Sequence, residues 1–161
     1  MSGIQSLLAI GAVLLFGLVS LRFNSTVVQN ISIEVENKVY LTAFSLADDK
    51  IEEIKQKAFD EETLTFKAIT PEELSNIGAD AGETNRKLFD DIDDYNNDTT
   101  HIGLPYLENF VVETKVFYAD PSNPNLNYGS KSYYKRVEVT VTSDHLSTPV
   151  TLSFIFTLHS K

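Results

Sequence analysis

An acidic stretch between positions 90 and 98 is the part of this sequence with the most candidate metal ligands. Its oxygen-bearing side chains are Asp90, Asp91, Asp93, Asp94, Asn96 and Asp98. Hard oxygen ligands at alternating positions suit Ca²⁺, so the spacing predicts a calcium site at Asp94, Asn96 and Asp98. The stretch does not meet the EF-hand pattern, because Thr99 and Pro105 occupy its sixth and twelfth positions.

Two other interpretations of the acidic stretch remain open. In the first, it is a solvated loop whose aspartates cap turns and backbone amides. In the second, a pair of carboxylates performs acid–base hydrolysis, as in glycosidases, and the residues to test are Asp91, Asp93 and Asp94. The second needs one acid in an apolar pocket, and nothing nearby in the sequence provides one. We therefore expect no enzymatic activity and no cofactor other than calcium.

The composition excludes several other kinds of chemistry. The chain has no cysteine, so disulfides, thiolate catalysis and cysteine-bound zinc are ruled out. His101, His145 and His159 share no motif or useful spacing. The formal net charge of −10 argues against a nucleic-acid partner, which requires a basic surface.

The elements that must position any such site begin with an uncharged apolar run from Ile4 to Leu21. As a helix, the run would be about 27 Å long, which is enough to cross the core of a bilayer. Arg22 ends it. The residues that we expect to make apolar contacts there are Leu7, Leu8, Ile10, Leu14, Leu15, Phe16, Leu18 and Val19, with Gly11 and Gly17 allowing close approach.

The helical pattern continues beyond this run as an amphipathic stripe. Apolar residues recur in steps of three and four at Val28, Ile31, Val35, Val39, Ala43, Leu46, Ile51, Ile54 and Ala58. This spacing places them on one face of a helix. No proline occurs before Pro71, so we predict one continuous helix to about Phe59.

The last third of the chain alternates between apolar and polar residues, which is typical of strands. The alternation covers 110–118, 133–142 and 150–158, and the intervening segments are rich in turn residues. We predict an antiparallel meander of three or four strands with one apolar face. That face needs a cover, and the amphipathic stripe is the one long apolar helix face available.

The middle of the chain gives weaker signals. Leu64, Phe66 and Ala68 alternate with polar residues and predict a short strand. Thr70 followed by Pro71 predicts a short helical turn. Residues 77–109 show little periodicity, and we expect an ordered excursion there.

Three segments resemble type IV pilin-like proteins, namely minor pilins and pseudopilins. Phe44–Ile54 resembles the end of their long helix, Phe89–Asn96 resembles an acidic loop, and Tyr134–Val141 followed by Val150–Ser153 resembles their terminal hairpin. The order and spacing of these segments extend along most of the chain. The resemblance implies an α+β fold in which a long N-terminal helix packs under a C-terminal antiparallel sheet.

The resemblance also implies a function, which is assembly into a filament. The subunit would be a single-pass membrane protein before assembly and part of a surface filament afterwards, with copies of itself or related pilins as partners. Gly3 is then the candidate processing site, and cleavage after it would make Ile4 the first residue of the processed chain. The family usually has a glutamate near the new N-terminus, whereas this chain has Leu7, Leu8 and Ala9 in that region.

The expected organisation has three parts: a membrane or filament-core segment at 1–24, an amphipathic segment at 25–60 and a globular β domain at 61–161. A membrane-tethered monomer, acting as a binding or accessory protein of a pilus or secretion system, is the alternative function. An anchored hydrolase that uses the acidic stretch is the third possibility.

Overall fold

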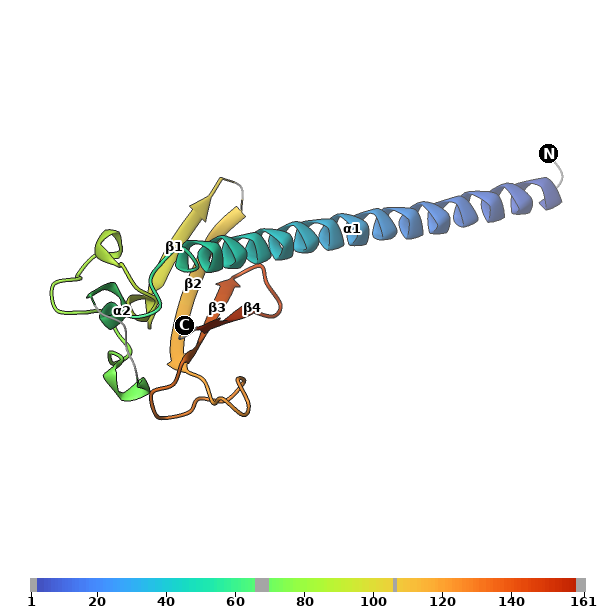
Figure 1. The fold of residues 1–161 in the computed structure, drawn as a ribbon. Helices are drawn as coiled ribbons and strands as arrows, with labels where there is room; N and C mark the ends of the chain where they lie inside the picture. The colour runs from blue at the N-terminus through green and yellow to red at the C-terminus, as the bar shows by residue number, and fades with distance from the viewer. Residues whose placement is uncertain (1–2, 66–69, 106, 159–161) are drawn as a thin grey trace. The chain divides into compact units, whose positions relative to one another are not determined.

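The structure is a computed structural model that describes residues 3–65, 70–105 and 107–158. The chain divides into two compact units, Met1–Lys38 and Val39–Lys161. Helix α1, Gly3–Ile54, includes residues of both units. The described residues of the first unit, 3–38, all belong to α1, and the second unit contains the last turns of α1 and the sheet (Figure 1).

Helix α1 confirms the predicted long helix but ends five residues earlier than expected. After Ile54 the backbone tightens into turns, in which Lys57 N donates to Ile54 O at 3.0 Å. The backbone of Ala58 then pairs with a distant segment: its N–H donates to Asp90 O, and its C=O accepts from Ile92 N. These bonds hold Ala58 extended, so the helix cannot continue to Phe59.

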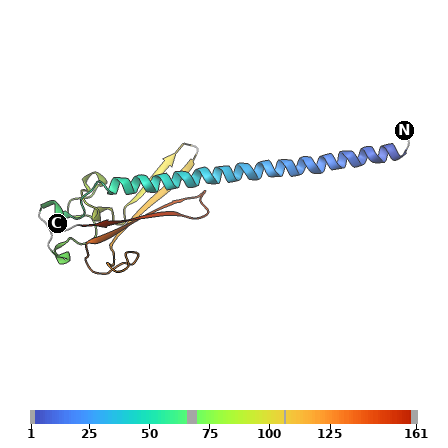
Figure 2. The ribbon, with the colours of Figure 1, turned by 45° about the vertical axis from the view of Figure 1, so that its right-hand side comes forward.

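Among the described residues, four strands form one antiparallel sheet in the order β1-β2-β3-β4 (Figure 2). They are β1 Thr99–Leu104, β2 Leu107–Tyr118, β3 Tyr134–Ser143 and β4 Val150–Thr157. The predicted meander is confirmed. Strand β1 lies in residues 77–109, for which the sequence predicts an ordered excursion without an assigned strand. Its side chains alternate only between exposed and half-buried, and the pattern in the sequence is therefore weak.

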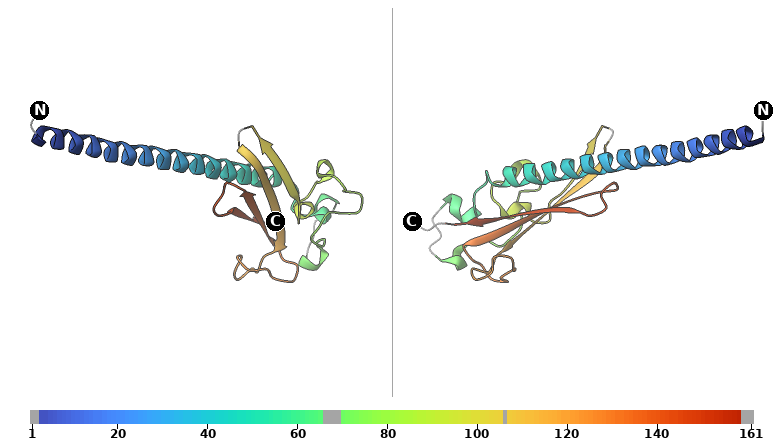
Figure 3. Two further views of the ribbon diagram at one scale, coloured as in Figure 1. Left: turned by 180° about the vertical axis from the view of Figure 1, so that it is seen from behind. Right: turned by 90° about the vertical axis from the view of Figure 1, so that its right-hand side faces the viewer.

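The core lies between one face of this sheet and the last turns of α1, which run along it in both views of Figure 3. The helix contributes Val39, Ala43, Ala47, Ile51 and Ile54, all buried. The sheet contributes buried valines at alternate positions: Val112, Val116, Val137, Val139 and Val141. The predicted α+β packing is therefore confirmed. The earlier part of the stripe, including Val28 and Val35, is exposed.

The connection after α1 corrects one prediction. Residues Glu61–Thr65 form a short helix, α2, where a strand was expected to begin. Asp60 starts it, since its side chain accepts from Glu62 N and its C=O accepts from Thr63 N. Of the predicted strand, Leu64 is therefore helical, and Phe66 and Ala68 lie outside the described residues. The predicted turn at Pro71 is confirmed as a 3₁₀ turn, Pro71–Glu73.

Candidate functional site

The apolar segment of α1, Ile4 to Leu21, has no protein cover. Each of its large side chains is 60–75% exposed, including Leu7 at 74% and Phe16 at 75%. This exposed set contains the predicted contact residues Leu7, Leu8, Ile10, Leu14, Leu15, Phe16, Leu18 and Val19. Among the described residues, α1 is the one helix long and apolar enough to cross a membrane. Gly3 and Ile4, the candidate processing positions, form its first turn.

Gly11 and Gly17 leave room along this segment. A Cβ atom built at either position would meet no heavy atom within 4 Å. The chain itself therefore does not require glycine at these two positions. Small residues on an apolar helix permit the backbone of a neighbouring helix to approach closely.

A buried charged cluster joins four distant parts of the second unit. Lys135 is on β3 and is fully buried. Its three ammonium hydrogens have three acceptors: Phe59 O at 2.7 Å, Asp60 Oδ2 at 2.7 Å and Asp93 Oδ2 at 2.6 Å. The Tyr118 hydroxyl lies 3.1 Å from Asp60 Oδ2. These contacts connect the turn between α1 and α2, the acidic stretch, β2 and β3.

The two aspartates of the cluster have opposite pKa shifts. Burial alone would raise the pKa of Asp60, but Lys135 and the backbone N–H groups of Glu62 and Ser75 together lower it. Burial raises the pKa of Asp93 to about 7, although Lys135 opposes the shift. One lysine balances one carboxylate, so the second retains its proton more readily.

This arrangement predicts that the second unit becomes less stable as the pH rises from about 4 to about 7. Unfolded aspartates have a pKa near 4. Folded Asp93 has a raised pKa of about 7, and Asp91 one of about 6, chiefly because both are buried. In this window the folded state binds more protons than the unfolded state, so the free energy of unfolding falls with increasing pH. Each such proton contributes a slope of up to about 1.4 kcal/mol per pH unit.

In an Asp93→Asn variant, the free energy of unfolding should fall less steeply with increasing pH. The difference in slope should be about the contribution of one proton. The measurement is urea unfolding of the full chain in detergent micelles between pH 4.5 and 7.5, followed by tyrosine fluorescence. All seven tyrosines lie after position 38, so the signal reports the second unit alone. Asp144→Asn, an exposed change in the turn between β3 and β4, is the control. An unchanged slope in Asp93→Asn would contradict the prediction.

The acidic stretch folds back on its own backbone. Asp91 Oδ1 accepts hydrogen bonds from Asp93 N at 2.7 Å and Asp94 N at 3.2 Å. Asp94 Oδ2 accepts from Asp90 N at 2.9 Å and Asp91 N at 3.1 Å. Asp91 and Asp94 are both buried. Their carboxylates thus cap the local turns, as the first alternative interpretation expects, but they do so in a buried setting and not in the solvated loop of that interpretation.

The three residues predicted to hold calcium have separate partners in the structure. Asn96 Oδ1 accepts from Val116 N at 3.1 Å. Asp98 forms an ion pair with Arg86, at 2.6 Å, and lies 3.6 Å from the Lys50 ammonium. Asp94 is engaged by backbone N–H groups. The calcium assignment stays a prediction. Among the described acidic residues, Asp94 groups with Glu83 and Asp90, and Asp98 is not a member of this group.

That acidic group consists of Glu83, Asp90 and Asp94, which can each place one carboxylate oxygen within 4.8 Å of the others. Glu83 shares a hydrogen bond with Asp94, which together with burial raises the pKa of Glu83 to about 7. A shared proton therefore relieves the repulsion between these two carboxylates near neutral pH.

Removing a capping carboxylate should destabilise the second unit. In Asp91→Ala, the N–H groups of Asp93 and Asp94 lose their acceptor in a buried setting, and each orphaned group costs about 1–3 kcal/mol. Asp91→Asn retains an acceptor oxygen and should lose less. Urea unfolding followed by tyrosine fluorescence measures both variants. Equal losses would show that the charge of Asp91, rather than its hydrogen bonds, is what stabilises the loop.

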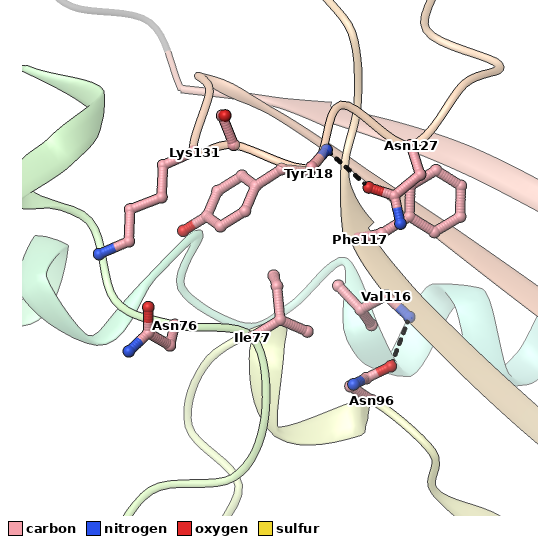
Figure 4. Close-up of a pocket in the computed structure, with 10 residues that line it drawn as sticks. Asn76, Ile77, Asn96, Val116, Phe117, Tyr118, Asn127 and Lys131 are labelled. Atoms are coloured by element: carbon pink, nitrogen blue, oxygen red, sulfur yellow. Dashed lines mark hydrogen bonds between the residues drawn. The ribbon is translucent and has the colours of Figure 1, made fainter.

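An open hollow of about 470 Å³ lies beside the cluster (Figure 4). Its lining includes Ile77, Asn96, Tyr118, Asn127 and Lys131. The polar groups at its wall mainly hold the surrounding loops: Asn127 Oδ1 accepts from Gly129 N, and the Lys131 ammonium donates to Leu74 O. The described lining residues include no aspartate, glutamate or histidine.

Sequence reasoning missed Lys135 and Asp60. The signal for Lys135 was present, since it has the same parity along β3 as Val137, Val139 and Val141, which face the core. Asp60 follows the helical stripe, and nothing in its neighbourhood in the sequence indicates a partner 75 residues later.

Two regions therefore differ in their chemistry. The apolar segment of α1 exposes a mainly apolar surface without any charged side chain, and the charged cluster around Lys135 is internal and holds segments together. Comparisons of the chain with family models, curated proteins and solved structures find no match.

Proposed function

We propose that this chain is a structural subunit of a type IV pilus-like filament or pseudopilus, and that it assembles through the apolar segment of α1. The observation that supports this proposal most is the contrast within one helix. Residues such as Leu14 and Phe16 are exposed, whereas Val39, Ala43 and Ala47 are buried in the core of the second unit. A helix with these two parts needs an apolar environment for the first part only.

In this proposal the segment has two successive environments. It first lies in the membrane, where the chain is a single-pass protein, since Ile4–Leu21 is uncharged and about 27 Å long. It then leaves lipid for a bundle of identical or related helices. Gly11 and Gly17 would allow neighbouring helices to approach closely. A contact of this kind that does not close on itself repeats and produces a fibre.

A membrane-tethered monomer is the second candidate function. The feature that favours it is the lack of an acidic residue in the first turn of α1, since pilins usually carry a glutamate there. In that case the apolar segment would be an anchor only, and the second unit would act as a binding or accessory module. Its acidic character makes a nucleic-acid partner unexpected in either case.

Electron microscopy of the sheared surface fraction from native cells, with peptide mass spectrometry, tests the proposal. Filaments composed mainly of this chain would support assembly, and their N-terminal peptide would show whether Gly3 is a processing site. Recovery of the chain from the membrane fraction alone, without any fibre that contains it, would favour the tethered monomer.

A further inference from the structure

Strand β4 has a free edge whose hydrogen-bonding groups can be assigned. It pairs with β3 on one side and ends the sheet on the other. Leu158 N donates to Tyr133 O at 2.9 Å, and the register from Thr157 to Val150 continues without a shift. In an antiparallel ladder, alternate residues direct both backbone groups toward the partner strand. The even-numbered residues therefore bond to β3, and Thr151, Ser153 and Ile155 direct their N–H and C=O groups outward.

This edge lacks the features that normally prevent strand addition. From Val150 to Leu158 the chain has no charged residue, proline or glycine. The opposite edge, β1, is interrupted, because its register shifts between Ile102 and Leu104. Bulges, prolines and charges are the usual ways in which edge strands avoid pairing. Among the described residues, no hydrogen bond engages the outward backbone groups of Thr151, Ser153 or Ile155.

We propose that β4 pairs antiparallel with β4 of a second copy of this chain, with the two-fold axis at Ser153. Thr151 of one copy then lies opposite Ile155 of the other, and the three outward residues of each copy exchange backbone hydrogen bonds. Two copies with a net charge of −10 repel one another wherever their acidic surfaces meet. Pairing at β4 places no like charges opposite one another.

The side chains beside the β4 edge are compatible with β4 of a second copy as the neighbouring strand. On the outer face, Arg136 is already neutralised by Glu138 at 2.8 Å and donates to Ser153 Oγ at 3.0 Å. On the inner face, Phe154 is 39% exposed, and the Lys55 ammonium lies 4.4 Å from its ring centroid. A second β4 would cover part of this exposed ring. The pairing does not rest on the proposed filament, because it uses none of the apolar side chains of Ile4–Leu21.

Disulfide trapping tests the pairing cleanly, because the native chain has no cysteine. Opposed residues in a hydrogen-bonded antiparallel pair have Cα atoms about 5.5 Å apart, which is within disulfide range. Full-length Ser153→Cys, oxidised mildly in detergent micelles, should give at least about tenfold more linked dimer than Thr99→Cys, an exposed position on β1. Equal yields, or no dimer, would overturn the proposal.

Three further variants in the Ser153→Cys background separate edge pairing from other association. Ile155→Pro removes an outward N–H and no bond to β3, so it should abolish the dimer while the sheet remains folded. Ile155→Lys should have the same effect through charge and serves if the proline variant unfolds. Leu14→Asp, which alters only the apolar segment, should leave the yield unchanged. A yield that falls with Leu14→Asp but persists in both Ile155 variants would assign the association to the helix and refute the proposal.

Discussion

Replacing Lys135 with alanine should destabilise the second unit by about 3–5 kcal/mol, the typical effect of removing one partner of a buried ion pair. Lys135 and Asp60 are fully buried, and Asp93 is 1% exposed. Without the ammonium group, both carboxylates and Phe59 O lose a hydrogen-bond donor. The cluster would then hold buried negative charge without compensation. The measurement is urea unfolding of the full chain in detergent micelles, followed by tyrosine fluorescence.

Two controls distinguish the cluster from a general effect of lysine removal. Lys115→Ala changes an exposed lysine on β2 and should alter the free energy of unfolding by less than about 0.5 kcal/mol. The triple change Lys135→Met, Asp60→Asn and Asp93→Asn removes the charges together and should recover most of the lost stability. If Lys135→Ala behaved like Lys115→Ala, the ion pairs would not be stabilising the unit.

The Lys135 ammonium is surrounded by particular groups on every side. The ammonium group lies 4.5 Å from the ring centroid of Phe59 and 5.2 Å from that of Tyr118, so aromatic faces fill the space that its acceptors leave. Ser75 joins the same cluster, because its backbone N–H donates to Asp60 and its hydroxyl donates to Asp93. The cluster thus fixes where the loops after α1 meet the sheet.

The long helix and most of the meander could be predicted from the sequence because both depend on local periodicity. Alternation over Val137, Val139 and Val141 indicates an inward face without knowledge of the partner. The length of α1 follows from an apolar run, a continuing stripe and the lack of proline before Pro71. The apolar segment itself, which carries the proposed function, was also recognised in full.

The remaining features depend on partners far away in the sequence. Lys135 lies on an apolar face, and only the positions of Asp60 and Asp93 make its burial tolerable. Helix α1 stops at Ile54 because Ala58 pairs with a segment more than 30 residues later. The spacing of Asp94, Asn96 and Asp98 suggested convergence, but backbone amides and Arg86 engage their oxygens separately. Oxygen-bearing residues at every second position of a sequence do not specify the direction in which the loop directs each side chain.

Replacing Leu14 with aspartate should abolish filaments. Leu14 is 64% exposed near the middle of the apolar segment. An aspartate at the centre of a membrane helix costs about 3 kcal/mol, or roughly a hundredfold in the equilibrium for insertion. The same charge would be desolvated in a bundle of apolar helices without a partner. Counts of filaments per cell, with immunoblots of membrane and sheared fractions, measure the effect, and Leu14→Ile is the conservative control.

Since Leu14→Asp also impairs membrane residence, a second change is needed to separate the filament subunit from the tethered monomer. Gly11→Leu makes the segment more apolar, so membrane insertion should be retained. The chain itself accepts a side chain there, because a Cβ atom meets nothing within 4 Å. Close approach of a neighbouring helix would be blocked, and filament counts should fall at least about tenfold at an unchanged membrane level. Normal filaments in Gly11→Leu would show that assembly does not use this close contact, and normal filaments in Leu14→Asp would contradict assembly through the apolar segment.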